Sequence, residues 1–190
     1  MTLTAIVLAG GRARRMGGGD KAFVALGGRS LLEHVLARIG AQVDQVIIST
    51  NGDPARFAAF GLPVVADLQP GFAGPLAGIL AGLRWAGGDV VSVPVDTPFL
   101  PDDLVARLQD GRGPAAAACA ASGGRLHPVV GLWGAGLADR MAAALIAGER
   151  RVAAFAASCG AVEVAFADDG FFNVNTPDDL QAATLRLSAR

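Results

Sequence analysis

Apolar positions along this chain form short blocks, and these alternate with stretches in which apolar residues recur every three or four positions. The first pattern predicts strands and the second predicts helices. We expect strands at residues 5–9, 45–50, 62–66, 89–95, 115–121, 127–133 and 162–166, and a last one between residues 171 and 175. We expect helices at residues 30–39, 75–85, 102–109, 135–147 and 151–158, a short one from Pro54, and a final one capped by Thr176. Ser30 and Glu33 form a capping box at the start of the first of these helices.

The regular alternation of strand and helix in the first half predicts a three-layer α/β domain with a mostly parallel sheet. The strands at 115–121 and 127–133 are joined by a turn too short for a parallel crossover, so we expect an antiparallel pair in the C-terminal half. No repeat, low-complexity linker or domain boundary is visible, and the length suffices for a full core. We therefore expect one domain over residues 1–190.

Polar residues or glycine follow four of the expected strands, at Gly10, Asn51, Asp67 and Asp96. In open α/β sheets, ligands bind outside the carboxyl ends of the strands. All four residues should therefore lie along one rim. Asn51 and Asp67, taken singly, are also typical turn residues, and it is the shared rim that favours a contact with a ligand.

The segment after the first strand is rich in glycine and positive charge. Glycines allow backbone N–H groups to approach phosphate oxygens, and fixed cations oppose the phosphate charge, so the segment predicts a phosphate-binding loop. Asp20 and Ala22 around Lys21 exclude the Walker pattern, and the glycine spacing excludes the dinucleotide fingerprint. A basic surface loop is the alternative. Lys21 argues against it, because it is the only lysine in the sequence and a compact ammonium suits a position between phosphates.

Composition narrows the choice of partners and compartment. The net charge is −1 and the basic charge is concentrated near Lys21, so we expect no nucleic-acid partner. No apolar run reaches membrane-spanning length and no signal-peptide pattern is visible, so we expect a cytoplasmic protein without membrane contact. Cys119 and Cys159 are expected to be free thiols rather than a disulfide, and the absence of a Cys/His cluster argues against zinc.

Asp96 is the best candidate for a metal ligand. It directly follows an apolar strand and should point into the rim. A lone carboxylate holds Mg²⁺ well when phosphates and water supply the other ligands. The alternative is an aspartate that caps the loop before Pro98.

The segment Leu8-Ala-Gly-Gly-Arg-Ala-Arg-Arg-Met-Gly-Gly-Gly-Asp-Lys21 resembles the signature loop of nucleotidyltransferases that build activated sugars and cofactors. Its Leu-Ala-Gly-Gly, Arg-Met-Gly and Asp-Lys elements are most similar to those of the molybdenum cofactor guanylyltransferases. Further matching segments are Gly-Pro-Leu-Ala-Gly at 74–78, Asp-Thr-Pro at 96–98, His-Pro at 127–128, Gly-Glu-Arg-Arg at 148–151 and Asn-Val-Asn-Thr-Pro at 173–177. The resemblance extends from Leu8 to Leu180.

This resemblance implies a three-layer, Rossmann-like α/β/α nucleotidyltransferase fold. It also implies a nucleotidyl transfer reaction. GMP would pass from GTP to the molybdenum-molybdopterin cofactor with release of pyrophosphate, and Mg²⁺ would assist. It further implies a monomer that works with molybdenum-insertion and molybdoenzyme maturation proteins. The catalytic residues would be Lys21, Asp96 and Arg15, with Asp96 as metal ligand. The nucleotide-binding residues would be Leu8, Ala9, Gly10, Gly11, Arg12, Lys21, Asn51, Asp67, Gly74, Pro75, Leu76 and Asp96.

The resemblance also implies contacts with the pterin substrate from Asn173, Asn175, His127 and Arg151. Each has a structural alternative: helix entry for the two asparagines, a packing role for His127, and a solvated helix start for Arg151. Two other functions remain open. A cytidylyltransferase of the same fold would more typically read Leu-Ala-Ala-Gly, so the glycine pair at 10–11 favours guanine. A non-catalytic nucleotide-binding protein could have lost either Lys21 or Asp96, and this chain retains both.

Overall fold

The computed structural model describes residues 2–10, 19–66, 74–167 and 170–189. Its centre is a sheet with the strand order β5-β4-β1-β6-β8-β7-β9. The strands are β1 (Thr4–Leu8), β4 (Gln45–Ser49), β5 (Val64–Val65), β6 (Val90–Pro94), β7 (Ala117–Ser122), β8 (Arg125–Trp133) and β9 (Val162–Ala165). β5, β4, β1 and β6 are parallel, while β8 runs antiparallel to both β6 and β7. The predicted mostly parallel sheet with an antiparallel pair in the second half is confirmed.

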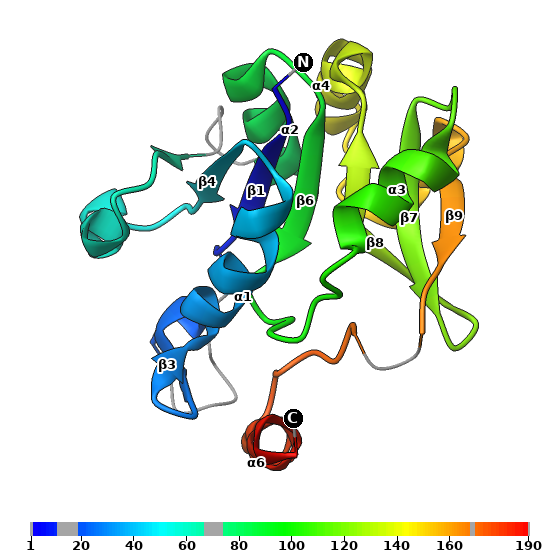
Figure 1. The fold of residues 1–190 in the computed structure, drawn as a ribbon. Coiled ribbons are helices and arrows are strands. Elements are labelled where there is room, and N and C mark those ends of the chain that lie inside the picture. Colours follow the sequence, from blue (N-terminus) through cyan, green and yellow to red (C-terminus); the bar gives the residue numbers. More distant parts are fainter. Residues whose placement is uncertain (1, 11–18, 67–73, 168–169, 190) are drawn as a thin grey trace.

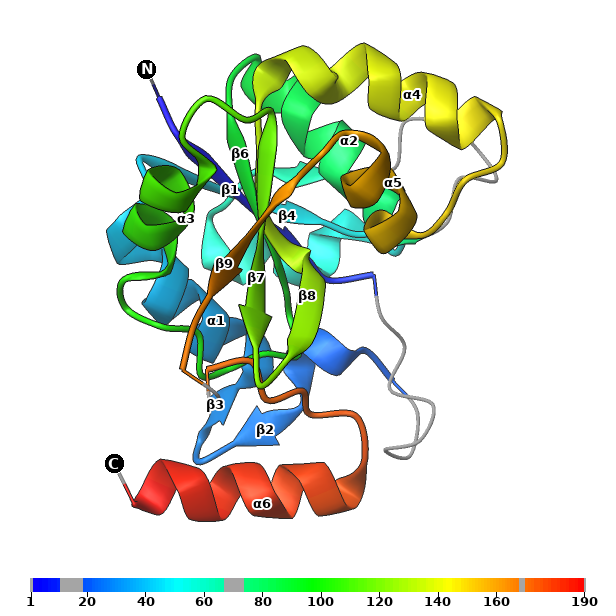
Figure 2. The same cartoon turned by 90° about the vertical axis from the view of Figure 1, so that its right-hand side faces the viewer.

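Helices cover both faces of the sheet (Figures 1 and 2). One face carries α1 (Leu31–Ile39) and α3 (Leu104–Arg112), and the other carries α2 (Pro75–Ala86), α4 (Ala138–Ile146) and α5 (Val152–Ser158). Successive residues of a strand point to opposite faces. Ile6 accordingly packs with α2, and Val7 packs with α1. This two-sided burial explains why the expected central strands read as continuous apolar runs.

The remaining elements are short or lie at one end of the sheet. α6 (Pro177–Ser188) lies below the sheet beside the small hairpin of β2 (Ala25–Leu26) and β3 (Arg29–Ser30) (Figure 2). The 3₁₀ helices are η2 (Lys21–Phe23), η3 (Gly40–Gln42), η4 (Pro54–Phe60) and η5 (Ala135–Leu137). The helix predicted at 135–147 thus begins as a 3₁₀ turn. None of the described helices combines the length and the apolar character needed to cross a membrane.

Capping side chains fix the starts of α1 and α6 as the sequence predicted. At α1, Ser30 Oγ accepts a hydrogen bond from the backbone N–H of Glu33 at 3.2 Å, and the Ser30 N–H donates to Glu33 Oε2 at 2.6 Å. At α6, Thr176 Oγ1 accepts from the Asp179 N–H at 3.1 Å, and Asp179 Oδ2 accepts from the Thr176 N–H at 2.8 Å. Each pair satisfies N–H groups that a helix start leaves without intrahelical partners.

The strand expected between residues 171 and 175 is wrong. These residues form no strand and instead cross the carboxyl end of the sheet, where Phe171 and Val174 are buried. The Val174 N–H donates to the backbone carbonyl of Asp96 at 2.9 Å, so this segment bonds to the loop after β6 rather than to a sheet edge. The hairpin β2–β3 was missed, although Gly27 and Gly28, with φ of 57° and 83°, supply the backbone that its tight turn requires.

β8 extends well beyond its pairing with β6. The β6–β8 register joins Val90 to Trp133, Val91 to Leu132 and Ser92 to Gly131, and then the pairing ends. The first half of β8, residues 125–130, projects beyond β6. Within the described chain, residues 125–127 pair only with β7, and residues 128–130 fall at a register shift without a partner on either strand. Pro128 fits at this interruption because proline has no N–H to donate to a neighbouring strand. This projecting half of β8 becomes one wall of the cavity described next.

The two cysteines are free thiols, as predicted. Cys119 is buried in the core, and this burial raises the pKa of its thiol to about 12. A thiol that is difficult to ionise is a poor nucleophile and metal ligand. Cys119 therefore serves as a small apolar core residue.

Candidate active site

A cavity of about 550 Å³ opens at the carboxyl ends of β4, β1 and β6. One wall comes from β1, β4 and the start of α2, and the opposite wall comes from the projecting half of β8 and the segment before α6. The first wall consists of Leu8, Gly10, Ser49, Thr50, Asn51, Gly74, Pro75 and Gly78. The second consists of residues 125–130 with Asn173 and Asn175, and Lys21 and residues 94–97 lie between the two walls. The rim predicted from the strand ends is thus a real cavity.

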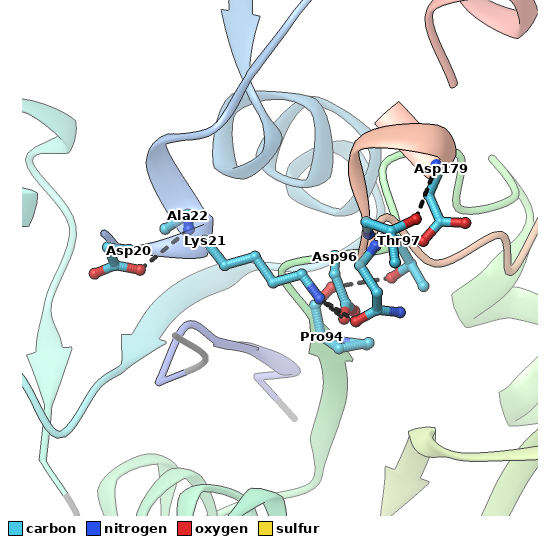
Figure 3. A network of polar contacts seen from close by, with 9 residues as sticks. Asp20, Lys21, Ala22, Pro94, Asp96, Thr97 and Asp179 are labelled. Atoms are coloured by element: carbon cyan, nitrogen blue, oxygen red, sulfur yellow. Dashed lines mark hydrogen bonds and ion pairs between the residues drawn. The ribbon is translucent and has the colours of Figure 1, made fainter. Parts of the chain in front are cut away.

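Lys21 and Asp96 both line this cavity, and their side chains meet in an ion pair (Figure 3). Lys21 Nζ donates hydrogen bonds to Asp96 Oδ2 at 2.6 Å and to Asn175 Oδ1 at 2.5 Å. The Lys21 side chain is 9% exposed and that of Asp96 is 20% exposed. A buried ammonium is stable only when oxygen atoms compensate its lost hydration, and these two side chains supply them.

The Lys21 backbone is held by the aspartate that precedes it. Asp20 Oδ1 accepts a hydrogen bond from the Ala22 N–H at 3.1 Å, which caps η2 and aims the Lys21 side chain into the cavity (Figure 3). Asp20 Oδ2 pairs with Arg56 of η4 at 3.3 Å, and the Arg56 guanidinium lies 5.3 Å from the centre of the Phe23 ring. The Asp-Lys pair of the sequence motif is therefore a structural unit, in which the aspartate orients the lysine.

Two further hydrogen bonds position the acceptors of the Lys21 ammonium. Thr97 Oγ1 donates to the carbonyl of Pro94 at 2.9 Å and closes the turn that carries Asp96 (Figure 3). Asp179 Oδ2 accepts from the Asn175 N–H at 2.9 Å, and this bond is the main reason why the pKa of the Asp179 carboxyl lies below its usual value. Asp179 thus fixes Asn175 as well as capping α6.

The arrangement around Nζ is suited to a cation. Asp96 and Asn175 each direct one oxygen at the same point, and hard divalent cations prefer such oxygen ligands. In the described part of the chain, no cluster of three or more histidine, cysteine, aspartate or glutamate side chains could hold a metal ion. A metal ion here would depend on Asp96 for protein charge and on substrate phosphates and water for its other ligands.

His127 lies on the projecting half of β8 and faces the cavity from the second wall. Its ring stacks on Phe171 with centroids 4.8 Å apart, and its Nε2 is 2.9 Å from Ser122 Oγ in a hydrogen bond. Burial, helped by the positive charge of Arg125, lowers the pKa of His127 below its ordinary value of 6.5. The imidazole is therefore neutral at pH 7.

We expect the lowered pKa of His127 to make the protein less stable in mild acid. Below pH 6.5 the unfolded chain binds the histidine proton more readily than the folded one, so the free energy of unfolding falls as pH drops through the folded pKa. Urea unfolding midpoints at pH 7.5 and 5.5 measure this fall. The fall in the urea midpoint should be smaller in His127→Gln than in the wild type. An equal fall in both proteins would show that His127 does not cause it.

Gly78 lies where α2 crosses the end of β1, and a side chain there would narrow the first wall. A Cβ atom on Gly78 would lie 2.5 Å from Leu8 Cδ2 and 2.8 Å from Ser49 Oγ. Overpacking costs about 1–3 kcal/mol, whereas replacing a helical glycine with alanine gains about 1 kcal/mol. We expect Gly78→Ala to lose about 1 kcal/mol in chemical denaturation.

Gly40 provides the matched control for this substitution. It has φ −62° and no atom within 4 Å of an added Cβ. We expect Gly40→Ala to gain about 0.4–1 kcal/mol, because alanine restricts the unfolded chain without a clash. Equal effects of the two substitutions would mean that Leu8 and Ser49 move aside freely.

Most predicted site residues that the structure describes lie in the cavity wall: Leu8, Gly10, Lys21, Asn51, Gly74, Pro75, Asp96, His127, Asn173 and Asn175. Ala9 and Leu76 are instead buried in the core, and Arg151 is an exposed residue at the start of α5 whose Nε lies 3.6 Å from Glu149 Oε1. Gly11, Arg12, Arg15 and Asp67 lie outside the described residues. Sequence reasoning missed Ser49, Thr50 and Arg125, whereas Gly78 and Thr97 belong to segments that it had matched without giving these two residues a role. Ser49 and Thr50 directly precede Asn51 and could have been found from the strand end, whereas Arg125 depends on the length of β8.

Comparison with known proteins shows which proteins this chain resembles. Residues 5–162 match the family model described as MobA-like NTP transferase domain. A molybdenum cofactor guanylyltransferase of Cereibacter sphaeroides is 53% identical over 188 residues, covering 96% of each chain. The crystal structure of molybdopterin-guanine dinucleotide biosynthesis protein A from Archaeoglobus fulgidus is 26% identical, with a TM-score of 0.81 over 98% of this chain and 100% of that one.

A more distant structure shares the fold alone. It is that of Rv0371C from Mycobacterium tuberculosis, solved as a complex with manganese, with 18% identity and a TM-score of 0.68 over 97% of this chain and 99% of that one. The family model covers most of this chain, and the curated relative matches it nearly end to end. The chain therefore belongs to the family of proteins with a MobA-like NTP transferase domain.

Proposed function

We propose that this protein transfers GMP from GTP to the molybdenum-molybdopterin cofactor, releases pyrophosphate and forms the guanine dinucleotide form of the cofactor. The observation that carries the proposal is the Lys21–Asp96 pair at the carboxyl rim, between two cavity walls, in a chain whose close relatives are named guanylyltransferases. One wall can take the nucleotide and the other the acceptor.

The chemistry requires positioning and charge neutralisation. An oxygen of the acceptor phosphate attacks the α-phosphorus of GTP in line, the bond to the bridging oxygen breaks, and pyrophosphate leaves with the bonding electrons. Lys21 can neutralise charge that builds up on the departing phosphates, and its ammonium already lies in the cavity. Arg12 and Arg15, between Gly10 and Lys21 in the sequence, should add positive charge to this loop.

The divalent metal that we propose is Mg²⁺, with Asp96 as its protein ligand. When bound, the ion would polarise phosphoryl oxygens and oppose their charge. Asp96 suits this role because it is only partly exposed, lines the cavity and offers a carboxylate. Asn175 supplies the second protein oxygen at the same point.

We assign the two walls to the two substrates. Asn51, Gly74 and Pro75 lie on the wall formed by β4, β1 and α2, where the sequence resemblance places the guanine nucleotide. The N–H groups at the start of α2 suit a carbonyl edge or an anion. His127 and Asn173 lie on the opposite wall and would contact the pterin. Lys21, Asp96 and Asn175 lie where the two substrates must meet.

Pyrophosphate release tests the proposal. The protein is incubated with Mg²⁺, molybdenum-loaded molybdopterin and either GTP or CTP. Rapid release with GTP and little with CTP is the expected result. Release with CTP alone would overturn the assignment of the base, and no release with either nucleotide would overturn the transfer to this acceptor.

A further inference from the structure

The second wall of the cavity has an outer end that the proposed reaction does not use. β8 leaves β6 at Gly131 and continues outward to Arg125. On β7, Ser122 and Cys119 lie opposite Arg125 and Gly131 and are three residues apart, so at about 3.3 Å per residue Arg125 lies roughly 10 Å from Gly131. Ser92 Oγ donates to the Val129 carbonyl at 2.7 Å and accepts from Trp133 Nε1 at 2.8 Å, which anchors the inner end of the wall to β6. The wall is therefore a fixed strand edge.

Arg125 brings positive charge to this outer end. Its side chain lines the cavity and is exposed. Across the four described ranges of the chain, no hydrogen bond or ion pair holds its guanidinium. It lies close enough to His127 for its charge to lower the pKa of that imidazole. The guanidinium therefore lies at the cavity without a partner among the described residues and is available to bind a ligand.

The charges of the cavity wall leave Arg125 uncompensated. Among the described wall residues, the charged ones are Lys21, Asp96 and Arg125, and His127 is neutral at pH 7. Lys21 and Asp96 neutralise each other at 2.6 Å. The remaining charge is the positive one of Arg125, at the end of the wall away from β6. A planar guanidinium there is suited to bind two oxygen atoms of an anion at once.

We propose that Arg125 binds the anionic metal-dithiolene group of the acceptor, beside its reacting phosphate, and so determines which acceptors bind along the second wall. This inference rests on the proposed function. The acceptor phosphate has to reach Lys21 and Asp96 to react. In molybdenum-molybdopterin the anionic dithiolene with its metal-bound oxygen atoms is part of the ring that bears the phosphate, so an acceptor with its phosphate at Lys21 and Asp96 would hold this group in the same cavity, which Arg125 lines.

Arg125→Ala tests this role, with Arg84→Ala as the control because Arg84 is an exposed arginine of α2 outside the cavity wall. We expect Arg125→Ala to raise KM for molybdenum-loaded molybdopterin by about tenfold or more, as for the loss of a charge-assisted hydrogen bond. The Kd for GTP and the kcat should change less than twofold. Arg125→Lys should raise KM less than Arg125→Ala does, because lysine keeps the positive charge but lacks the planar guanidinium that can bind two oxygen atoms.

Equilibrium dialysis of the same acceptor, without GTP, separates this inference from the proposed function. Wild-type binding that Arg125→Ala weakens about tenfold supports the role of Arg125 even if transfer fails. An acceptor Kd or KM for Arg125→Ala equal to that for Arg84→Ala would overturn it. A parallel loss of GTP affinity would also overturn it, since Arg125 would then act on the nucleotide. Failure of the wild type to bind the acceptor would overturn both proposals.

Discussion

Asp96→Asn should lower kcat/KM for GMP transfer by about a thousandfold or more, because the substitution removes the negative charge that the metal ion requires. The amide keeps the size of the carboxylate and an oxygen that can accept from Lys21 Nζ, now 2.6 Å from Asp96 Oδ2. The fold should therefore persist. Pyrophosphate release measured across a range of Mg²⁺ concentrations checks the result, and the residual activity should need more Mg²⁺ for half-saturation.

Asp103→Asn is the matched control for Asp96→Asn. Asp103 precedes α3, and its side chain is 61% exposed. Among the described residues, that side chain makes one long ion pair, with Arg107 at 3.8 Å. Its replacement should leave both activity and melting temperature nearly unchanged, since surface ion pairs contribute little. Unchanged turnover in Asp96→Asn itself would refute the metal assignment.

Lys21→Met should lower kcat by about a hundredfold or more, because an uncharged chain of similar length cannot oppose charge on the leaving pyrophosphate. Lys21→Arg should also be impaired although it keeps the charge. A planar fork cannot place one compact donor at both 2.6 Å from Asp96 and 2.5 Å from Asn175. Single-turnover kinetics with saturating GTP separate the chemical step from nucleotide binding.

The stability of Lys21→Met is a control for its activity. The substitution removes a desolvated ammonium, but it leaves the Asp96 carboxylate, 20% exposed, without its cation. Removing one partner of a largely buried ion pair is destabilising overall, and the partial exposure of Asp96 limits the loss, so we expect a lower melting temperature in a protein that still folds. Full activity in Lys21→Met would mean that the single lysine of the chain has no role in the reaction.

The sequence predicted the sheet and its ligand-binding rim because both depend on local signals. Short apolar runs in the sequence predicted β1, β4 and β6. The residues that follow these strands, Gly10, Asn51 and Asp96, were expected on one rim, and in the structure they line one cavity. The capping patterns at Ser30 and Thr176 were confirmed for the same reason: each is complete within four residues of chain.

The sequence could not predict features that depend on how distant segments of the chain pack together. Residues 171–175 have the apolar alternation of a strand, yet they bond to the loop after β6 because α6 has to reach the hairpin β2–β3. Nothing local to Arg125 indicates that β8 projects beyond β6. The ion pair between Asp20 and Arg56 joins the start of η2 to η4, and the approach of these two elements depends on the order of β1 and β4 in the sheet.

The contacts of the Lys21 ammonium have a consequence for how the protein acquires its activity. Nζ binds side chains that are 75 and 154 residues away along the chain. Closing such long loops costs chain entropy that only an already assembled sheet can offset, so these bonds form late in folding. Because Asn175 directly precedes the cap of α6, the reactive centre and the docking of the last helix are completed together. A nascent chain without its final helix would hold a finished sheet and still be catalytically silent.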